Sequence, residues 1–139
     1  MRLLGIDFGV KRIGLALSDA MGYSAHPLKI INRKSLAEDI MAIKLVVEEN
    51  QVSKIVLGLP LNMDGSEGKS AQDARIFAEK LVEGVKLPVE LFDERLSSLQ
   101  TERILVEEAD MSRDKRKGVR DKIAASLFLQ AYLDSHRSI

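Results

Sequence analysis

Short apolar blocks in the first third of the chain predict three strands. Residues 2–8 are rich in Leu and Ile, the turn-like sequence GVKR follows, and residues 13–17 form a second apolar block. Residues 28–31, after the breakers Gly22 and Pro27, form the third. Because the connections are short, we expect these strands to pair as an antiparallel meander.

Helical periodicity begins after this meander and then alternates with strand patterns. Ser35 and Glu38 have the spacing of a capping box, which with the apolar positions that follow predicts a helix to about residue 50. The remaining predicted elements are a strand at 54–59, a helix at 71–82, a strand at 89–93, a helix at 97–109 and a helix from residue 119 or 120.

Apolar spacing also predicts which sides of the later helices are buried. The core contacts expected from helix 71–82 are Ile76, Leu81 and Val82. Those expected from the last helix are Ile123, Leu127 and Ala131, with Ala124, Phe128 and Leu129 widening the stripe. The polar segment MSRDKRKG, which precedes that helix, is expected to be unpacked.

The element order, three strands followed by alternating strands and helices, predicts the fold class. It favours an α/β fold with a mixed five-stranded sheet flanked by helices over an all-parallel doubly wound sheet. The chain has 139 residues, 45% of them hydrophobic, which suits one domain spanning 1–139 with a single well-filled core.

Charge and cysteine content narrow the classes of function. Lys plus Arg and Asp plus Glu number 21 each, so no whole-molecule field attracts nucleic acid or membranes. The absence of cysteine excludes a disulfide scaffold and thiolate metal sites, and makes the cytoplasm the expected location. No apolar run approaches the roughly 18 residues of a membrane span.

One local exception to the neutral charge is the segment RDKRKGVR at 113–120. It has five basic residues against one acidic residue, and Asp121 follows it directly. We expect these cations to hold a phosphate backbone without reading its sequence, although a solvated helix or loop face is the simpler interpretation. The basic residues are Arg113, Lys115, Arg116, Lys117 and Arg120.

Asp7 is the most informative acidic residue, because it interrupts the apolar run of the first strand. Its neighbours Ile6 and Phe8 imply burial on at least one side. A buried carboxylate costs several kcal/mol unless it is paired, hydrogen-bonded or bound to a cation. A structural ion pair with an arginine and a metal site are therefore the two interpretations of Asp7.

Three further acids stand at the ends of predicted elements. Asp93 and Glu94 end the last strand beside Arg95, and Asp121 falls in the first turn of the final helix. Capping, pairing with arginine or the helix dipole would explain each of them alone. If the first strand is central and the last helix crosses the strand ends, the carboxylates converge and need a cation. Oxygen-only ligands select Mg²⁺ or Mn²⁺, which supports phosphodiester hydrolysis.

Four segments resemble the YqgF family, also called RuvX. They are GIDFGVKRIGLALSD, IVLGLPLNMDGSEG, FDERLSSLQTE and DKIAASLFLQAYL, in the family's order over nearly the whole chain. The resemblance implies an RNase H-like fold related to RuvC-type Holliday-junction resolvases. It also implies a nuclease role in maturing the 5′ end of pre-16S ribosomal RNA during ribosome biogenesis.

The same resemblance implies catalytic and metal-binding roles for three residues. They are Asp7, Asp121 and one acid of the FDER pair, where Glu94 is favoured and Asp93 is the alternative. Side chains alternate along a strand, so only one of two consecutive acids can face the metal. RuvC-like resolvases commonly carry two carboxylates one turn apart on the last helix, whereas Ala124 and Ala125 follow Asp121 here. That departure favours cleavage of a flexible substrate over junction resolution.

Further cations extend the predicted nucleic-acid surface. Lys11 and Arg12 follow Asp7 closely and are placed to meet phosphates, although a solvated turn explains them equally well. Lys69 lies in the GSEGKS loop, which lacks the glycine spacing of a Walker site. The expected partners are structured RNA or branched DNA and ribosomal particles, with the protein a monomer or weak homodimer.

Two other classes of function remain open from the sequence. An actin-like, ATP-binding phosphotransferase has a similar first hairpin, but such enzymes bind nucleotide between two domains and 139 residues supply only one. A non-catalytic nucleic-acid or ribosome-binding module would keep the fold and use only the basic segment. Loss of Asp7 distinguishes this module from the enzyme, since it would abolish cleavage only in the enzyme.

Overall fold

The computed structural model describes the backbone of residues 2–62, 64–93 and 113–136, and their side chains except those of 113–122. Five strands form one mixed sheet in the order β3-β2-β1-β4-β5. β1 is antiparallel to β2 and β2 to β3, whereas β4 is parallel to both β1 and β5. The strands are β1 (Arg2–Phe8), β2 (Arg12–Ser18), β3 (Ala25–Asn32), β4 (Val52–Leu59) and β5 (Val89–Asp93).

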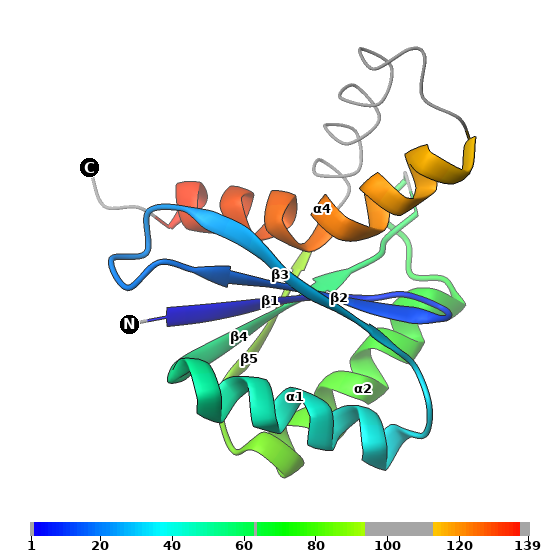
Figure 1. Ribbon diagram of the computed structural model, residues 1–139. Helices are drawn as coiled ribbons and strands as arrows, with labels where there is room; N and C mark the ends of the chain where they lie inside the picture. Colours follow the sequence, from blue (N-terminus) through cyan, green and yellow to red (C-terminus); the bar gives the residue numbers. More distant parts are fainter. Residues whose placement is uncertain (1, 63, 94–112, 137–139) are drawn as a thin grey trace.

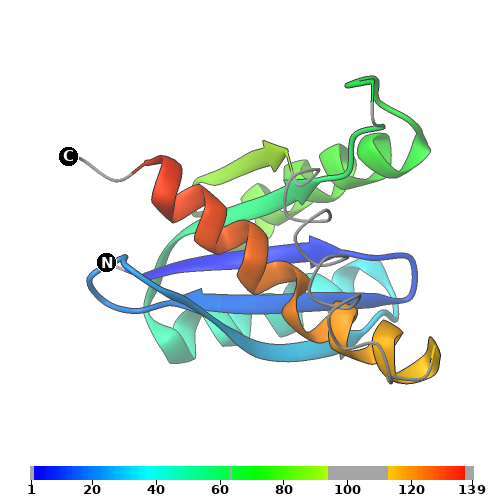
Figure 2. The same cartoon turned by 90° about the horizontal axis from the view of Figure 1, so that it is seen from above.

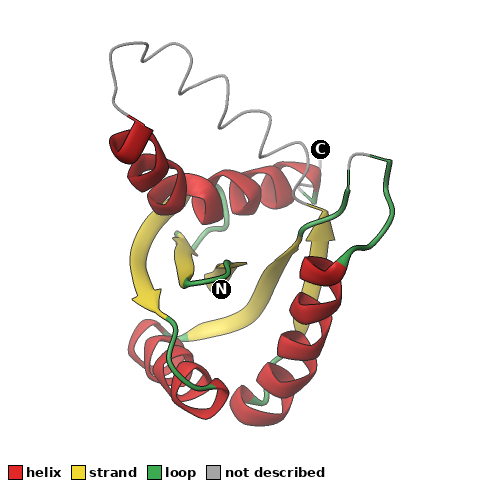
Figure 3. Cartoon of the chain, turned by 90° about the vertical axis from the view of Figure 1, so that its right-hand side faces the viewer, coloured by secondary structure: helices red, strands yellow, loops and turns green. Residues whose placement is uncertain are grey.

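Helices cover both faces of this sheet. Helices α1 (Leu36–Asn50) and α2 (Lys69–Val85) pack side by side on one face, and α4 (Arg113–Ser135) crosses the other face diagonally (Figures 1, 2 and 3). The predicted mixed five-stranded sheet flanked by helices is confirmed, and the first strand is central as the convergence of the acids requires. No described helix is long and apolar enough to cross a bilayer.

Strand alternation divides the core into two clusters and fixes the face of Asp7. On β1, Leu4 and Ile6 face α1 and α2, whereas Leu3 and Gly5 face α4. Asp7 continues the second series and therefore lies on the α4 face. The strand that supplies the core of the sheet thus also delivers one carboxylate beneath α4.

Several predicted elements are confirmed. The strands at 2–8 and 89–93 have the observed bounds, and the hydroxyl of Ser35 accepts a hydrogen bond from the Glu38 amide at the start of α1. The expected strand at 28–31 is wrong at its start, because β3 begins at Ala25 and includes Pro27. β3 is an edge strand, and an edge position tolerates a residue that cannot donate a hydrogen bond.

The predicted buried side of α2 is wrong in two of its three residues. Leu81 is buried, but Ile76 and Val82 are exposed. The buried stripe consists instead of Ala71, Ala74, Phe77, Ala78 and Leu81. Four of these five are small or aromatic residues that a search for Ile, Leu and Val passes over, and alanine suits the close packing of α2 against the sheet and α1.

The last helix begins earlier than predicted. α4 starts at Arg113 and so includes the basic segment that we expected to precede it as an unpacked stretch. Lys and Arg have high helix propensity, and a helical start needs no buried side chains. Its buried apolar residues are Ala125, Phe128, Leu129, Tyr132 and Leu133. Phe128 and Leu129 were predicted, whereas the predicted central line through Ile123, Leu127 and Ala131 is only half-buried. The predicted helix at 97–109 lies outside the described residues.

Helix α4 approaches β1 closely at Gly5. A Cβ atom at Gly5 would lie 3.0 Å from the Leu129 Cβ and 3.3 Å from the Ala125 carbonyl oxygen. Beyond this contact, the Gln130 side chain accepts a hydrogen bond from the Ala25 amide and donates one to the Tyr23 carbonyl. These contacts fix where α4 crosses the sheet.

A polar cluster anchors the C-terminal half of α4 to β4 and β5. Lys54 donates a hydrogen bond of 2.8 Å to the Tyr132 hydroxyl, and its Nζ lies 3.7 Å from Glu90 Oε2. His136 Nε2 lies 4.0 Å from the same oxygen. Hydrogen bonding with Tyr132, and then the charges of Lys54 and His136, hold the pKa of Glu90 below its ordinary value. The ionised carboxylate therefore favours the docked helix.

We expect Gly5→Ala to destabilise the protein by about 1–3 kcal/mol, because the new methyl group overlaps Leu129 and the α4 backbone. Urea unfolding measures the change. Gly68→Ala is the matched control, since a Cβ there would meet its nearest atom, Asn62 Nδ2, at 3.5 Å. Gly68 is also the N-cap of α2, where glycine is preferred to alanine, so the loss there should be below about 1 kcal/mol, and equal losses in the two variants would contradict the close approach.

Replacing Glu90 with Gln should lower the unfolding free energy at pH 7 by less than about 1 kcal/mol, since the carboxylate is partly exposed. The folded-state pKa of Glu90 is lowered, so its contribution is present above the unfolded-state pKa and is lost as the pH falls through the folded value. The difference from wild type should therefore shrink as the pH falls below the ordinary range of a glutamate, and vanish once the carboxyl group is protonated in the folded protein. Glu49→Gln, at an exposed position on α1, removes the same charge outside this cluster and is the matched control.

Candidate active site

Asp7 lies near the C-terminal end of the central strand, between residues that carry no side chain. It pairs with Gly14 on β2, and Gly14 pairs in turn with Ile30 on β3. On its other side, Ile6 pairs with Leu57, so the register brings Gly58 of β4 beside Asp7. The half-buried carboxylate therefore has no neighbouring side chain on β2 or β4 at its own level of the sheet.

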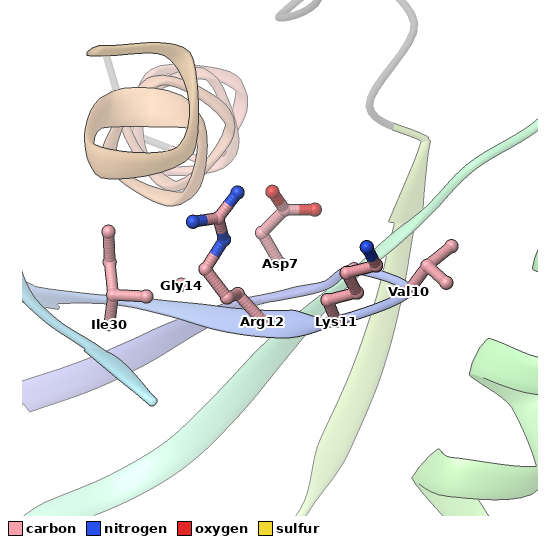
Figure 4. A pocket seen from close by; sticks show the side chains of 7 residues that line it. Asp7, Val10, Lys11, Arg12, Gly14 and Ile30 are labelled. Atoms are coloured by element: carbon pink, nitrogen blue, oxygen red, sulfur yellow. The ribbon is translucent and has the colours of Figure 1, made fainter. Parts of the chain in front are cut away.

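A pocket of about 290 Å³ opens over this part of the sheet. Figure 4 shows the side chains of Asp7, Arg12 and Ile30 rising from the sheet toward α4, with Lys11 and Val10 on the adjoining turn. Arg12 and Asp7 are diagonal neighbours on paired strands, a spacing that long side chains can bridge. The lining residues are Asp7, Gly9, Val10, Lys11, Arg12, Gly14 and Ile30. The structure thus brings two predicted phosphate contacts, Lys11 and Arg12, together with the predicted metal ligand.

Arg33 holds the turn that forms one wall of this pocket. Its guanidinium donates hydrogen bonds to the carbonyl oxygens of Gly9, at 3.0 Å, and Val10, at 2.9 Å. The same group lies over the Phe8 ring at 4.2 Å, and that ring stacks on Phe77 of α2. A chain of contacts from α2 to the turn therefore orders the backbone beside Asp7. No sequence motif indicated Arg33, since its partners are backbone atoms more than 20 residues away.

The course of α4 brings Asp121 toward the same end of β1. Tyr132 and Leu133 cluster with Leu3 at the start of β1, whereas Ala125 lies over Gly5. The helix thus runs opposite to β1, and the backbone of Asp121 lies four residues, about 6 Å along the axis, before Ala125. The side chain of Asp121 is outside the described residues, as are those of the basic residues at 113–120.

Strand alternation in β5 assigns a face of the sheet to only one of the two acids of FDER, Asp93. Val89 and Leu91 pack with the core beneath α1 and α2, whereas Phe92 packs beneath α4. By alternation Asp93 belongs to the α1 and α2 face, away from Asp7. Glu94 and Arg95 lie outside the described residues, so their roles remain predictions.

The parallel strands place further polar groups at this edge. Because β1, β4 and β5 run in one direction, their C-terminal ends meet at the edge where ligands bind in open α/β sheets. Lys69 begins α2 there, exposed, after a loop in which Ser66 hydrogen-bonds to Asp64. Among residues described with their side chains, no three acids or histidines are grouped closely enough to hold a metal ion.

Comparisons with known proteins place this chain in a family. The model of the family described as "RuvX: Holliday junction resolvase" matches residues 1–135. The chain belongs to the RuvX family. A RuvX relative from Syntrophomonas wolfei is 52% identical over 96% of this chain and 94% of its own. Another, from Caldanaerobacter subterraneus, is 49% identical over 99% of both chains. Each bears the name "Putative pre-16S rRNA nuclease".

Solved structures of low sequence identity share the fold of this RuvX protein. Thermus thermophilus RuvC, in a complex with a Holliday junction, aligns with a TM-score of 0.58 at 13% identity over 97% of this chain and 96% of its own. The fowlpox virus resolvase aligns with a TM-score of 0.56 at 14% identity, and the alignment covers 99% of this chain and 100% of the resolvase. The RNase H-like fold implied by the sequence motifs is confirmed.

Removing the Arg33 guanidinium should loosen the turn beside Asp7. In Arg33→Gln the Gly9 amide, which donates to the Arg12 carbonyl at 2.9 Å, should exchange its hydrogen about five to ten times faster. Lys34→Gln removes the same charge from the next residue and should leave that rate unchanged. Hydrogen exchange followed by NMR measures both, and an unchanged rate in Arg33→Gln would show that the turn does not depend on the guanidinium.

Proposed function

We propose that this protein is a metal-dependent nuclease that hydrolyses phosphodiester bonds in the 5′-end processing of pre-16S rRNA. The observation that carries the proposal is the half-buried carboxylate of Asp7 in a pocket that also contains Lys11 and Arg12. The two cationic side chains can bind an anionic substrate. The carboxylate can hold a metal cation beside the reacting phosphodiester. The names of the relatives at 52% and 49% identity supply the RNA substrate.

The surroundings of Asp7 fit a hydrated Mg²⁺ or Mn²⁺. The carboxylate oxygen is a hard ligand, and the glycine on the neighbouring strand leaves room for the waters that Mg²⁺ retains. Asp7 would hold the ion together with Glu94 and Asp121. Such an ion, when bound, lowers the pKa of a coordinated water and stabilises charge on the phosphodiester.

The chain's own groups bind and orient the substrate. Lys11 and Arg12 face the same pocket as Asp7 and contact the phosphate next to the cleaved bond. Lys69, Arg95 and the basic first turns of α4 extend this contact along the backbone. Phosphate contacts of this kind position a strand without specifying its sequence. The reaction belongs in the cytoplasm, on free precursor RNA or ribosomal particles.

Junction resolution is the second candidate, because the family description and both solved structures name Holliday junctions. One contact argues against it. Ala125, one turn after Asp121, is buried, and its backbone lies against Gly5. A second carboxylate at position 125 would have no room, so α4 offers fewer metal ligands than the RuvC pattern. We therefore favour RNA over a four-way DNA junction.

A structural role for Asp7 is the competing interpretation. The Arg12 guanidinium lies on the same face, and a carboxylate held by arginine alone would support the fold without chemistry (Figure 4). In that case neutralising Asp7 would lower stability and leave any cleavage intact. The nuclease proposal requires the opposite result.

Asp7→Asn should reduce Mg²⁺-dependent cleavage of a short RNA spanning the 5′ end of 16S rRNA by at least about 100-fold, and EDTA should abolish cleavage by wild type. RNA affinity should be retained. Glu94→Gln and Asp121→Asn should behave like Asp7→Asn, whereas Asp93→Asn should stay active because that side chain belongs to the other face of the sheet.

Asp73→Asn, at an exposed position on α2, controls for the change of charge. A four-way DNA junction assayed in parallel tests resolution. Equal cutting of RNA by wild type and Asp7→Asn would refute the nuclease assignment, and retained RNA binding without any cutting would favour the binding module.

A further inference from the structure

Two exposed apolar side chains line the pocket of Asp7. Val10, at the turn between β1 and β2, is 82% exposed, and Ile30, on the edge strand β3, is 38% exposed. Both line the same pocket as Asp7, Lys11 and Arg12. We call Val10 and Ile30 the apolar wall.

The apolar wall is held in place by its surroundings. The carbonyl oxygens of Gly9 and Val10 both accept hydrogen bonds from Arg33, so the turn presents Val10 in an ordered position. Ile30 is fixed by its pairing with Gly14 in the ladder of β2 and β3. A preformed surface loses little conformational freedom when it binds a ligand.

A single row across the sheet connects the apolar wall to the carboxylate. Asp7, Gly14 and Ile30 are successive partners on three neighbouring strands. At about 4.8 Å between strands, the backbones of Asp7 and Ile30 are separated by about 10 Å, with Gly14 as a floor that has no side chain. The pocket therefore has an acidic side, an apolar side and cations at its rim.

We propose that this pocket binds one unpaired nucleotide of the substrate, with its base against the apolar wall and its phosphate toward Lys11, Arg12 and Asp7. The inference rests on the proposed nuclease function and specifies its substrate class as RNA that is single-stranded at the cleaved bond. The separation of about 10 Å between the backbones of Asp7 and Ile30 suits a nucleotide, in which an apolar base face is joined to an anionic phosphate.

Size and chemistry both favour an unpaired nucleotide over a duplex. A volume of about 290 Å³ is at the lower end for small-ligand sites, so the pocket accepts one nucleotide unit. A duplex presents sugars and phosphates outward and keeps its base faces stacked, so it offers no exposed base face to contact Val10 and Ile30. Bases of single-stranded segments are free to leave the stack and contact protein side chains.

Binding measured in EDTA tests this proposal without any cleavage. The probes are a labelled 12-nucleotide RNA, the same RNA in a blunt duplex, and a 12-mer in which abasic riboses replace the central nucleotides. Fluorescence anisotropy of the full chain at about 50 mM salt gives each dissociation constant, since phosphate contacts weaken as salt rises. Wild type should bind the single strand more tightly than the abasic strand.

Val10→Ser and Ile30→Ser should each weaken binding of the single strand about fivefold and leave binding of the duplex and the abasic strand unchanged. Two exposed apolar residues outside the pocket are matched controls. Met21, 73% exposed in the next turn, corresponds to Val10, and Leu28, 37% exposed on β3, corresponds to Ile30. Met21→Ser and Leu28→Ser should bind all three probes as wild type does.

Equal affinity of wild type for the intact and abasic strands would overturn the proposal, as would equal weakening of single strand and duplex by the variants. Val10 is too exposed for its replacement to unfold the chain, so a folding defect in Ile30→Ser would leave Val10→Ser to decide. Failure of the nuclease function is recognised separately, by cleavage that Asp7→Asn does not change. The proposed nucleotide subsite is therefore tested by the measured dissociation constants alone, independently of cleavage.

Discussion

The close approach of α4 to the central strand at Gly5 is the constraint on which the candidate site depends. A side chain at this position would overlap Leu129, so glycine sets how near the helix can lie to the sheet. Asp7 is two residues further along the same face of β1. The height of α4 above Gly5 therefore determines the space above the carboxylate and how near the backbone of Asp121 comes to it.

The site combines that packing constraint with a rigid turn. The guanidinium of Arg33 joins the turn at residues 9 and 10 to Phe8, and Phe8 is stacked on Phe77 in α2. Helix α2 thus supports the turn at the pocket through Phe8 and Arg33, while α4 lies over the face of the sheet on which the pocket opens (Figure 4). An ordered site needs little rearrangement when substrate binds, which is how a scaffold contributes to catalysis.

Predictions from sequence succeeded where local sequence signals were strong. They failed where contacts with neighbouring strands or helices determined the bounds of an element or its buried face. The capping box at Ser35 and the bounds of β1 and β5 were predictable because each depends on residues close in sequence. The extent of β3 was not, because only its edge position makes Pro27 acceptable within a strand. The face of α2 was misjudged because alanine is buried where two helices and a sheet meet, and spacing alone does not show which neighbours a helix has.

The sequence by itself determined that an acidic residue interrupts a central apolar strand, and its motifs indicated the RuvX family and the three predicted acids. Only the tertiary structure decided that Asp7 faces α4, that glycines flank it, and that Lys11, Arg12, Val10 and Ile30 share its pocket. The physical reason is that composition and periodicity report local preference. Strand pairing and the approach of a helix bring together residues far apart in the chain, and no local pattern encodes those distances.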